Sequence, residues 1–274
     1  MLNCMQTGKE RVEEKLSEKK IRKSLGEKEF IREITILSET DSTNRYLKEQ
    51  AVHGAAAGTV VLAEGQSAGR GRHGRNFFSP GKKGIYMSVL LRPEIELQKS
   101  VRITSMAAVA VARAVERVSG IPAQIKWVND IFLHGKKVCG ILTEAGINYE
   151  TGILDYAVLG IGVNVGKMEF PEELGAIATS VGNECGQNVS RNILIAEILK
   201  ELAYWYPSLW DGSFLKESRR RSVLLGKEIL VVDTLEDGGS YTARAVDLDD
   251  MGHLLIERDG KRQELNSGEV SIRL

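Results

Sequence analysis

Residues 66–75, QSAGRGRHGR, and residues 126–130, KWVND, are the stretches that decide how this chain folds and acts. In the first stretch, arginines alternate with glycines. Glycine lets the backbone approach a ligand closely, and arginine supplies a forked donor suited to phosphate or carboxylate. Apolar segments typical of strands flank the stretch at Thr59–Ala63 and Ile85–Leu91. We therefore expect a loop that closes over a phosphorylated ligand. It is not a P-loop, because the G-x-x-x-x-G-K-S/T pattern is absent.

The second stretch lies in an expected strand over residues 124–133. Alternate residues of a strand share a face, so we expect Lys126 and Asp130 on one side and Asn129 on the other. A hairpin turn at the following His-Gly pair would return Lys137 close to Asp130. A carboxylate beside a lysine keeps both groups charged, and the ammonium then neutralises an anion that develops during acyl transfer. Without its neighbours, this stretch would favour a surface hairpin with solvated charges.

Two further segments carry weaker signals. Residues 41–44, DSTN, precede a helix expected to end near Ala51, and Asp-Ser-Thr before a helix is a common N-cap. The same residues form a cluster of neutral donors and acceptors, which suits a polar, uncharged group such as a urea ring. Residues 160–164, GIGVN, come at the end of an apolar strand expected over 155–163, where glycine and asparagine allow approach to a nucleotide.

The composition excludes several classes of protein. Of 274 residues, 37 are basic and 37 acidic, so no net field draws nucleic acid or a membrane surface. The three cysteines form no C-x-x-C pair, which indicates neither a disulfide framework nor a zinc site. No apolar stretch approaches the roughly 20 residues of a membrane span, and the charged N-terminus is unlike a signal peptide. We expect a cytoplasmic protein with no membrane partner.

The chain divides into three expected parts. Residues 1–30, rich in Lys, Arg and Glu, indicate a charged extension that is a solvated helix or a partly ordered tail. Residues 31–223 form the expected catalytic domain, with long helices over 101–118 and 191–206. Residues 224–274 hold short alternating segments and glycine-containing turns, which indicate a small β-barrel. Its expected strands cover 228–232, 241–247, 253–257 and 270–274.

The order of the motifs is more specific than any one of them. It runs DSTN at 41–44, QSAGRGRHGR at 66–75, KWVND at 126–130, KVCGIL at 137–142 and GIGVN at 160–164. This order resembles that of the biotin protein ligases, over roughly residues 31–273. The resemblance implies an α+β fold: a mixed β-sheet flanked by helices, related to the class II aminoacyl-tRNA synthetases, followed by a small SH3-like β-barrel.

The resemblance also implies a two-step reaction. Biotin and ATP, with Mg²⁺, give biotinyl-5′-adenylate and pyrophosphate. A lysine of a biotin carboxyl carrier protein then displaces AMP. The ATP phosphates would supply most of the coordination of the magnesium ion, so its protein ligands are not assigned. Family members include monomers and dimers, and a homodimer is therefore compatible with the resemblance.

Individual residues receive implied roles. Lys137, Arg72 and Asp130 are the implied catalytic residues, because two anions meet when the mixed anhydride forms and cations must offset their repulsion. The implied biotin-binding residues are Ser42, Thr43, Asn44, Gln66, Gly69, Arg70, Gly71, Arg72, Lys137 and Gly140. The implied residues for ATP and the adenylate are Arg70, Arg72, Arg75, Lys126, Asn129 and Asn164.

The sequence departs from the family pattern at three positions. Val128 replaces the proline of K-W-P-N-D, which alters backbone stiffness but no reacting group, so we expect activity to survive. Phe77 stands where tryptophan is usual, which alters packing over the ligand. Cys139 stands where a small residue is common, and we expect a buried, inert thiol.

Two other functions compete with this interpretation. A lipoate–protein ligase or octanoyltransferase shares the catalytic fold, but Gln66, the arginine loop and the expected barrel favour biotin. A nucleic-acid-binding regulator would use the arginine loop as an RGG-like tract. The balanced charge argues against it, and the roughly 30 residues before the catalytic domain are short for a helix-turn-helix module. We expect no operator DNA binding.

Overall fold

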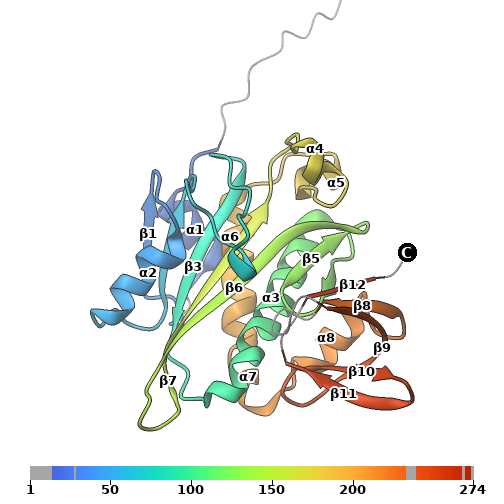
Figure 1. The fold of residues 1–274 in the computed structure, drawn as a ribbon. Coiled ribbons are helices and arrows are strands. Elements are labelled where there is room, and N and C mark those ends of the chain that lie inside the picture. The colour runs from blue at the N-terminus through green and yellow to red at the C-terminus, as the bar shows by residue number, and fades with distance from the viewer. Residues whose placement is uncertain (1–13, 28, 233–238, 267–268, 273–274) are drawn as a thin grey trace, which may run out of the picture.

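The computed structural model describes residues 14–27, 29–232, 239–266 and 269–272, which form two β-sheets with helices (Figure 1). The strands of the larger sheet are β1 (Glu33–Leu37), β2 (Thr59–Ala63), β3 (Gly84–Leu91), β4 (Gln124–Lys126), β5 (Asp130–Leu133), β6 (Lys136–Ile147) and β7 (Leu154–Asn164). Their order across the sheet is β1-β2-β3-β7-β6-β5-β4. The β1–β2 pair is parallel and the other pairs are antiparallel, so the sheet is mixed, as predicted.

Helices cover both faces of the larger sheet. Residues of α1, α3 and α6 pack in the main core and residues of α2 in a smaller cluster. The described helices are α1 (Glu18–Leu25), α2 (Thr43–Val52), α3 (Ser100–Ser119), α4 (Glu172–Gly175), α5 (Val181–Cys185), α6 (Arg191–Trp205), α7 (Ser208–Asp211) and α8 (Leu215–Arg221). Successive residues of β2 point to opposite faces. Val60 and Leu62 therefore join the main core with α3 and α6, and Val61 joins a smaller cluster with α2. Ser42 and Ser190 cap α2 and α6, as the sequence indicates.

The N-terminal segment corrects one expectation. Residues 14–25 are not a solvated tail, because Leu16, Ile21 and Leu25 are buried in the main core and α1 packs on α6. Ile21 and Leu25 are one turn apart and share a helix face, so two apolar residues suffice to dock a helix whose other faces are charged. The expectation for residues 1–13 lies outside the described residues.

The KWVND stretch also differs from its prediction. Residues 124–133 are not one strand, because residues 127–129 form a turn between β4 and β5. Lys126 and Asp130 are therefore cross-strand partners in an antiparallel hairpin. Alternation along a single strand does not apply to them. The next turn is as predicted, with positive φ at His134 and Gly135 between β5 and β6.

The C-terminal sheet is antiparallel throughout, as expected for the barrel. Its strands are β8 (Glu228–Val232), β9 (Ser240–Leu248), β10 (Leu254–Arg258), β11 (Lys261–Leu265) and β12 (Glu269–Ile272), in the order β11-β10-β9-β8-β12. The sequence did not predict β11, because KRQEL lacks apolar alternation. Residues 273–274 of the last expected strand lie outside the described residues. Among the described helices, none is both long and apolar enough to cross a bilayer.

Candidate active site

A cavity of about 590 Å³ opens between the arginine loop and strands β3, β6 and β7. It brings together nearly all the residues that the sequence singled out. The predicted residues that line it are Ser42, Thr43, Asn44, Gln66, Arg70, Gly71, Arg72, Arg75, Lys126, Asn129, Asp130, Lys137, Gly140 and Asn164. Gly69 is not among the lining residues. A Cβ at Gly69 would lie 2.5 Å from the Ser79 hydroxyl, so this glycine lets the two ends of the loop approach each other.

One end of the cavity is neutral and internally hydrogen-bonded. The Gln66 side-chain oxygen accepts from the Thr43 backbone N–H at 2.9 Å and from the Thr43 hydroxyl at 3.2 Å. The buried Ser88 hydroxyl lies 2.6 Å from the Asn44 side-chain oxygen and 2.8 Å from the Thr43 hydroxyl. Sequence analysis missed Ser88, although a hydroxyl inside the apolar run of β3 was a signal for it. These contacts fix the orientation of neutral groups at the N-terminus of α2.

Asn44 also depends on a glycine of the GIGVN segment. Its amide donates to the Leu142 carbonyl at 3.2 Å and to Glu144 Oε2 at 2.9 Å. A Cβ at Gly160 would lie 2.2 Å from Asn44 Oδ1, a distance that no such pair tolerates. The first glycine of this segment therefore makes room for Asn44, a role that its place in the sequence does not reveal.

The other end of the cavity is cationic. Lys137 Nζ lies 2.7 Å from Asp130 Oδ1, which confirms the predicted proximity across the β5–β6 hairpin. The contact is an ion pair whose angles depart from those of a hydrogen bond. The backbone of Lys137 is held on its other side, where its N–H donates to Ile177 O and its carbonyl accepts from Thr179 N–H, each at 2.9 Å. The ammonium is thus positioned by two segments, of which the sequence identified one.

The arginine loop contacts the β4–β5 turn across the cavity. Arg72, at the start of a 3₁₀ turn over Arg72–Gly74, donates to the Asn129 side-chain oxygen at 3.3 Å. The Asn129 amide in turn donates to the Ile141 carbonyl at 3.1 Å. Within the loop, the Gly71 N–H donates to the Arg75 carbonyl at 2.7 Å. The loop is therefore folded over the cavity, with Arg72 in contact with Asn129.

Phe77, one of the departures from the family pattern, packs on two glycines of the sheet, Gly140 and Gly162, which we call the glycine floor. Gly140 and Gly162 are partners on β6 and β7. A Cβ at Gly162 would lie 2.6 Å from the Phe77 ring, and one at Gly140 would lie 3.4 Å from it. Cys139 is fully buried beside this floor. Burial raises the pKa of its thiol far above the usual range, although the nearby Lys137 opposes the shift. The thiol stays protonated and inert, as expected.

Sequence analysis also missed an apolar cover over the cavity. Phe78 of the loop contacts Phe170, with ring centroids 5.9 Å apart. Leu174 and Ile177 follow along the same segment, and Val270 reaches the cavity from β12 of the C-terminal sheet. These residues are scattered in the sequence and show no motif, so only the fold brings them to the site.

The cavity thus joins neutral donors and acceptors to a cluster of cations beneath a glycine-rich loop, a site for a ligand with a polar ring and anionic groups. A family model described as the biotin/lipoate A/B protein ligase family matches residues 37–164, and one described as the biotin protein ligase C terminal domain matches residues 224–273.

Individual relatives agree with these models. The chain is 34% identical to the bifunctional ligase/repressor BirA of Bacillus subtilis, covering 94% of this chain and 79% of that protein. It is 30% identical to the biotin–[acetyl-CoA-carboxylase] ligase of Mycobacterium tuberculosis, over 96% of this chain and 98% of that one. The solved biotin protein ligase of Aquifex aeolicus, in complex with biotin and ATP, matches with a TM-score of 0.75 and 30% identity, over 89% and 99% of the two chains. The chain belongs to the biotin protein ligase family.

Proposed function

We propose that this chain is an ATP-dependent biotin–protein ligase, which forms biotinyl-5′-adenylate and passes biotin to a carrier lysine. One observation carries the proposal: a single cavity joins a neutral hydrogen-bonding end at Gln66 to a cationic end at Lys137. The neutral end suits the uncharged ureido ring of biotin, and the cationic end suits a carboxylate and phosphates. The Aquifex aeolicus relative is solved with biotin and ATP, which supports the same two substrates here.

In the first step, a carboxylate oxygen of biotin bonds to the α-phosphorus of ATP. The bond from that phosphorus to the oxygen bridging to the β-phosphate breaks, and pyrophosphate leaves. Both reactants are anions, and their repulsion opposes the approach. Lys137, 2.7 Å from Asp130, offsets the charge where carboxylate and phosphate meet. Arg72 offsets it from the loop side, and Asp130 holds the ammonium in place.

In the second step, the carrier lysine attacks the acyl carbon as a neutral amine. The bond from that carbon to the AMP oxygen breaks, AMP leaves and the new amide nitrogen loses a proton to solvent. The folded arginine loop and the apolar cover limit the access of water to the adenylate. The substrates supply both nucleophiles, so no nucleophilic side chain of the enzyme is required, in keeping with the inert thiol of Cys139.

The residue assignments follow from these steps. We assign biotin to Ser42, Thr43, Asn44, Gln66, Gly69, Arg70, Gly71, Arg72, Lys137 and Gly140. Gly69 acts through the loop conformation rather than by lining the cavity. We assign ATP and the adenylate to Arg70, Arg72, Arg75, Lys126, Asn129 and Asn164. Asn164 supports this assignment, because its side-chain oxygen is buried without a partner in the described structure.

The cavity offers little for a resident magnesium ion. Among the described lining residues, Asp130 is the one carboxylate, and it is paired with Lys137. Magnesium is commonly held by one or two carboxylates together with substrate phosphates. The phosphates of ATP would therefore bring the ion and supply most of its ligands, and its chemistry would be to neutralise the departing pyrophosphate.

The acceptor is a biotin-accepting domain of a carboxylase, as the names of the relatives suggest. We further propose that residues 31–223 carry the adenylation chemistry and that residues 224–274 complete the site as a separate barrel domain. Residues 1–30 form an extension, of which residues 14–25 support the catalytic core.

The test is an ATP–pyrophosphate exchange assay with biotin or lipoate as the acid. We expect exchange that requires biotin. Addition of a biotin-accepting domain should then raise the mass of that domain by one biotinyl group. Exchange with lipoate alone would contradict the proposal.

A further inference from the structure

The turn between β4 and β5 faces two ways. On one side, the Trp127 indole N–H donates to the carbonyl of Gly252, in the β9–β10 turn, at 2.9 Å. Trp127 and Val128 are buried in the hydrophobic cluster of the C-terminal sheet, although Trp127 also contributes to the cavity lining. On the other side, Asn129 lines the cavity and accepts from Arg72. Trp127 and Asn129, two residues apart in the turn, therefore connect the C-terminal sheet to the part of the cavity assigned to the nucleotide.

A second contact holds the same β9–β10 turn. Arg102, buried at the start of α3, donates to the Asp250 carbonyl through Nε, at 3.0 Å, and through Nη2. It also donates to the carbonyls of Leu209 and Trp210, at 2.9 and 3.1 Å. Gly252 itself lies against α3, since a Cβ there would be 3.4 Å from the Ser105 hydroxyl. The turn is thus fixed to the helix beneath the sheet as well as to Trp127.

The chain after α8 supports β4 from its free edge. The Val223 N–H donates to the Ile125 carbonyl at 3.0 Å, and Ser222 forms a bridge with the same residue. Ile125 precedes Lys126, which lines the cavity. Both the strand before the turn and the turn itself are therefore held by residues that follow α8 in the sequence.

We propose that Trp127 is a positioning residue for the nucleotide side of the cavity. Its hydrogen bond to Gly252 fixes the β4–β5 turn, and the turn places the Asn129 amide that receives Arg72. This inference rests on the proposed function, which assigns ATP to Asn129 and Arg72. Loss of the indole N–H leaves a buried carbonyl unpaired and lets the turn shift. The biotin side is held separately by Gln66 and Thr43, so its affinity is unaffected.

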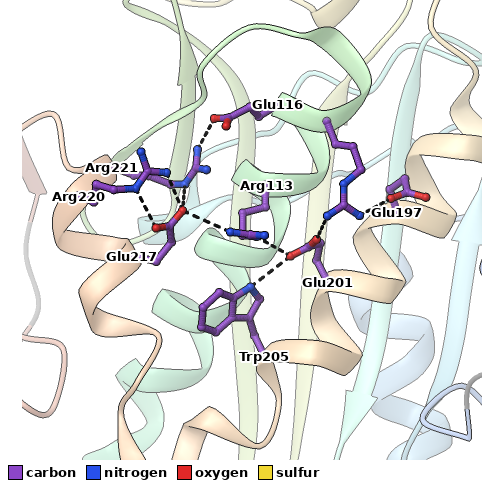
Figure 2. Close-up of polar contacts among 9 residues, drawn as sticks. Arg113, Glu116, Glu197, Glu201, Trp205, Glu217, Arg220 and Arg221 are labelled. Atoms are coloured by element: carbon purple, nitrogen blue, oxygen red, sulfur yellow. Dashed lines mark hydrogen bonds and ion pairs between the residues drawn. The ribbon is translucent and has the colours of Figure 1, made fainter.

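The test compares Trp127→Phe with a matched control, Trp205→Phe. The Trp205 indole also makes one hydrogen bond, to Glu201 Oε2 at 3.2 Å, in the charged network between α3 and α6 (Figure 2). We expect Trp127→Phe to raise KM for ATP roughly tenfold, the equivalent of about 1.4 kcal/mol, while KM for biotin stays unchanged. Trp205→Phe should lower the melting temperature and leave both KM values unchanged.

Calorimetric titration with ATP separates this inference from the proposed function, because it needs no turnover. Weaker ATP binding by Trp127→Phe supports the positioning role even if biotin supports no exchange. Unchanged ATP affinity, or an equal loss for ATP and biotin, would overturn it. If Trp127→Phe does not fold, Arg102→Lys provides the second variant. It keeps the charge but lacks the forked donors, so it should also weaken ATP binding selectively. Wild-type ATP affinity in Arg102→Lys would likewise count against the role.

Discussion

Two groups of charged residues in this molecule differ in how completely their charges are matched. The cavity pair, Lys137 and Asp130, is partly open to the cavity, and because their contact is an ion pair without hydrogen-bond geometry, the ammonium keeps donors for a ligand. The network between α3, α6 and α8 is matched by other side chains of the protein (Figure 2). There Glu201 accepts from Arg113, Arg117 and Trp205, at 2.8, 2.6 and 3.2 Å. A matched charge holds helices together, whereas a charge with donors to spare can bind a substrate.

The largest effect that we expect from this difference is on activity. Lys137→Ala should reduce the rate of adenylate formation about 1000-fold, or ~4 kcal/mol, because removing one group that stabilises developing charge costs this much in enzymes. The melting temperature should stay close to that of the wild type, since Lys137 is partly exposed. Pre-steady-state measurement of pyrophosphate release checks the rate. Wild-type turnover would remove Lys137 from the proposed mechanism.

The second prediction concerns the matched network. Glu201→Ala should lower the free energy of unfolding by about 3 kcal/mol, because it leaves Arg113 and Arg117 without their buried partner. The kcat of the folded variant should be unchanged, since α6 lies outside the cavity lining. Urea denaturation measures the loss. Glu197→Ala is the control, and we expect a smaller loss because Glu197 is more exposed than Glu201. A fall in kcat would show that the network also contributes to catalysis, contrary to the difference proposed between the two groups.

These groups also show what the sequence could predict. The proximity of Lys137 to Asp130 was predictable because a two-residue His-Gly turn returns β6 alongside β5. The exact pairing was not, since Lys137 lies opposite Phe132 in the register and reaches Asp130 through its side chain. The role of Glu201 was not predictable, because its two arginine partners are 84 and 88 residues away. The contact between Gly160 and Asn44 was not predictable either, because these residues are also far apart in the sequence. The same holds for the apolar cover formed by Phe170 and Val270. Local patterns indicate elements and motifs, and contacts between distant elements need the fold.

The third prediction concerns the effect of pH on the charged network between α3, α6 and α8. A hydrogen bond from Arg220, supported by a second from Arg221, lowers the pKa of Glu217 from 4.5 to about 2, although burial opposes the shift. A lowered folded-state pKa contributes stability that is present above the unfolded value and is lost as the pH falls through the folded value. The contribution is on the order of 2 kcal/mol, after allowance for solvent screening at the exposed Arg220.

We therefore expect Glu217→Gln to be less stable than the wild type above pH 4.5, and the difference to shrink as the pH falls toward about 2. Melting curves for both proteins at several pH values measure it. A difference that stays constant over this range would show that the Glu217 carboxylate contributes by packing rather than by charge.

The smallest effect that we expect concerns Asp130, the partner of Lys137 in the cavity. Asp130→Asn keeps a side-chain oxygen near Lys137 but removes the negative charge that holds the ammonium in place. The ammonium can then be held by the biotin carboxylate alone, so we expect the rate of adenylate formation to fall roughly tenfold, or about 1.4 kcal/mol. In the double variant with Lys137→Ala, Asp130→Asn should cost almost nothing further, because Asp130 acts through the lysine. Single- and double-variant rates from the pyrophosphate exchange assay measure this coupling. Additive losses would mean that Asp130 acts on the substrates independently of Lys137. The two residues would then not work as one pair in the cavity.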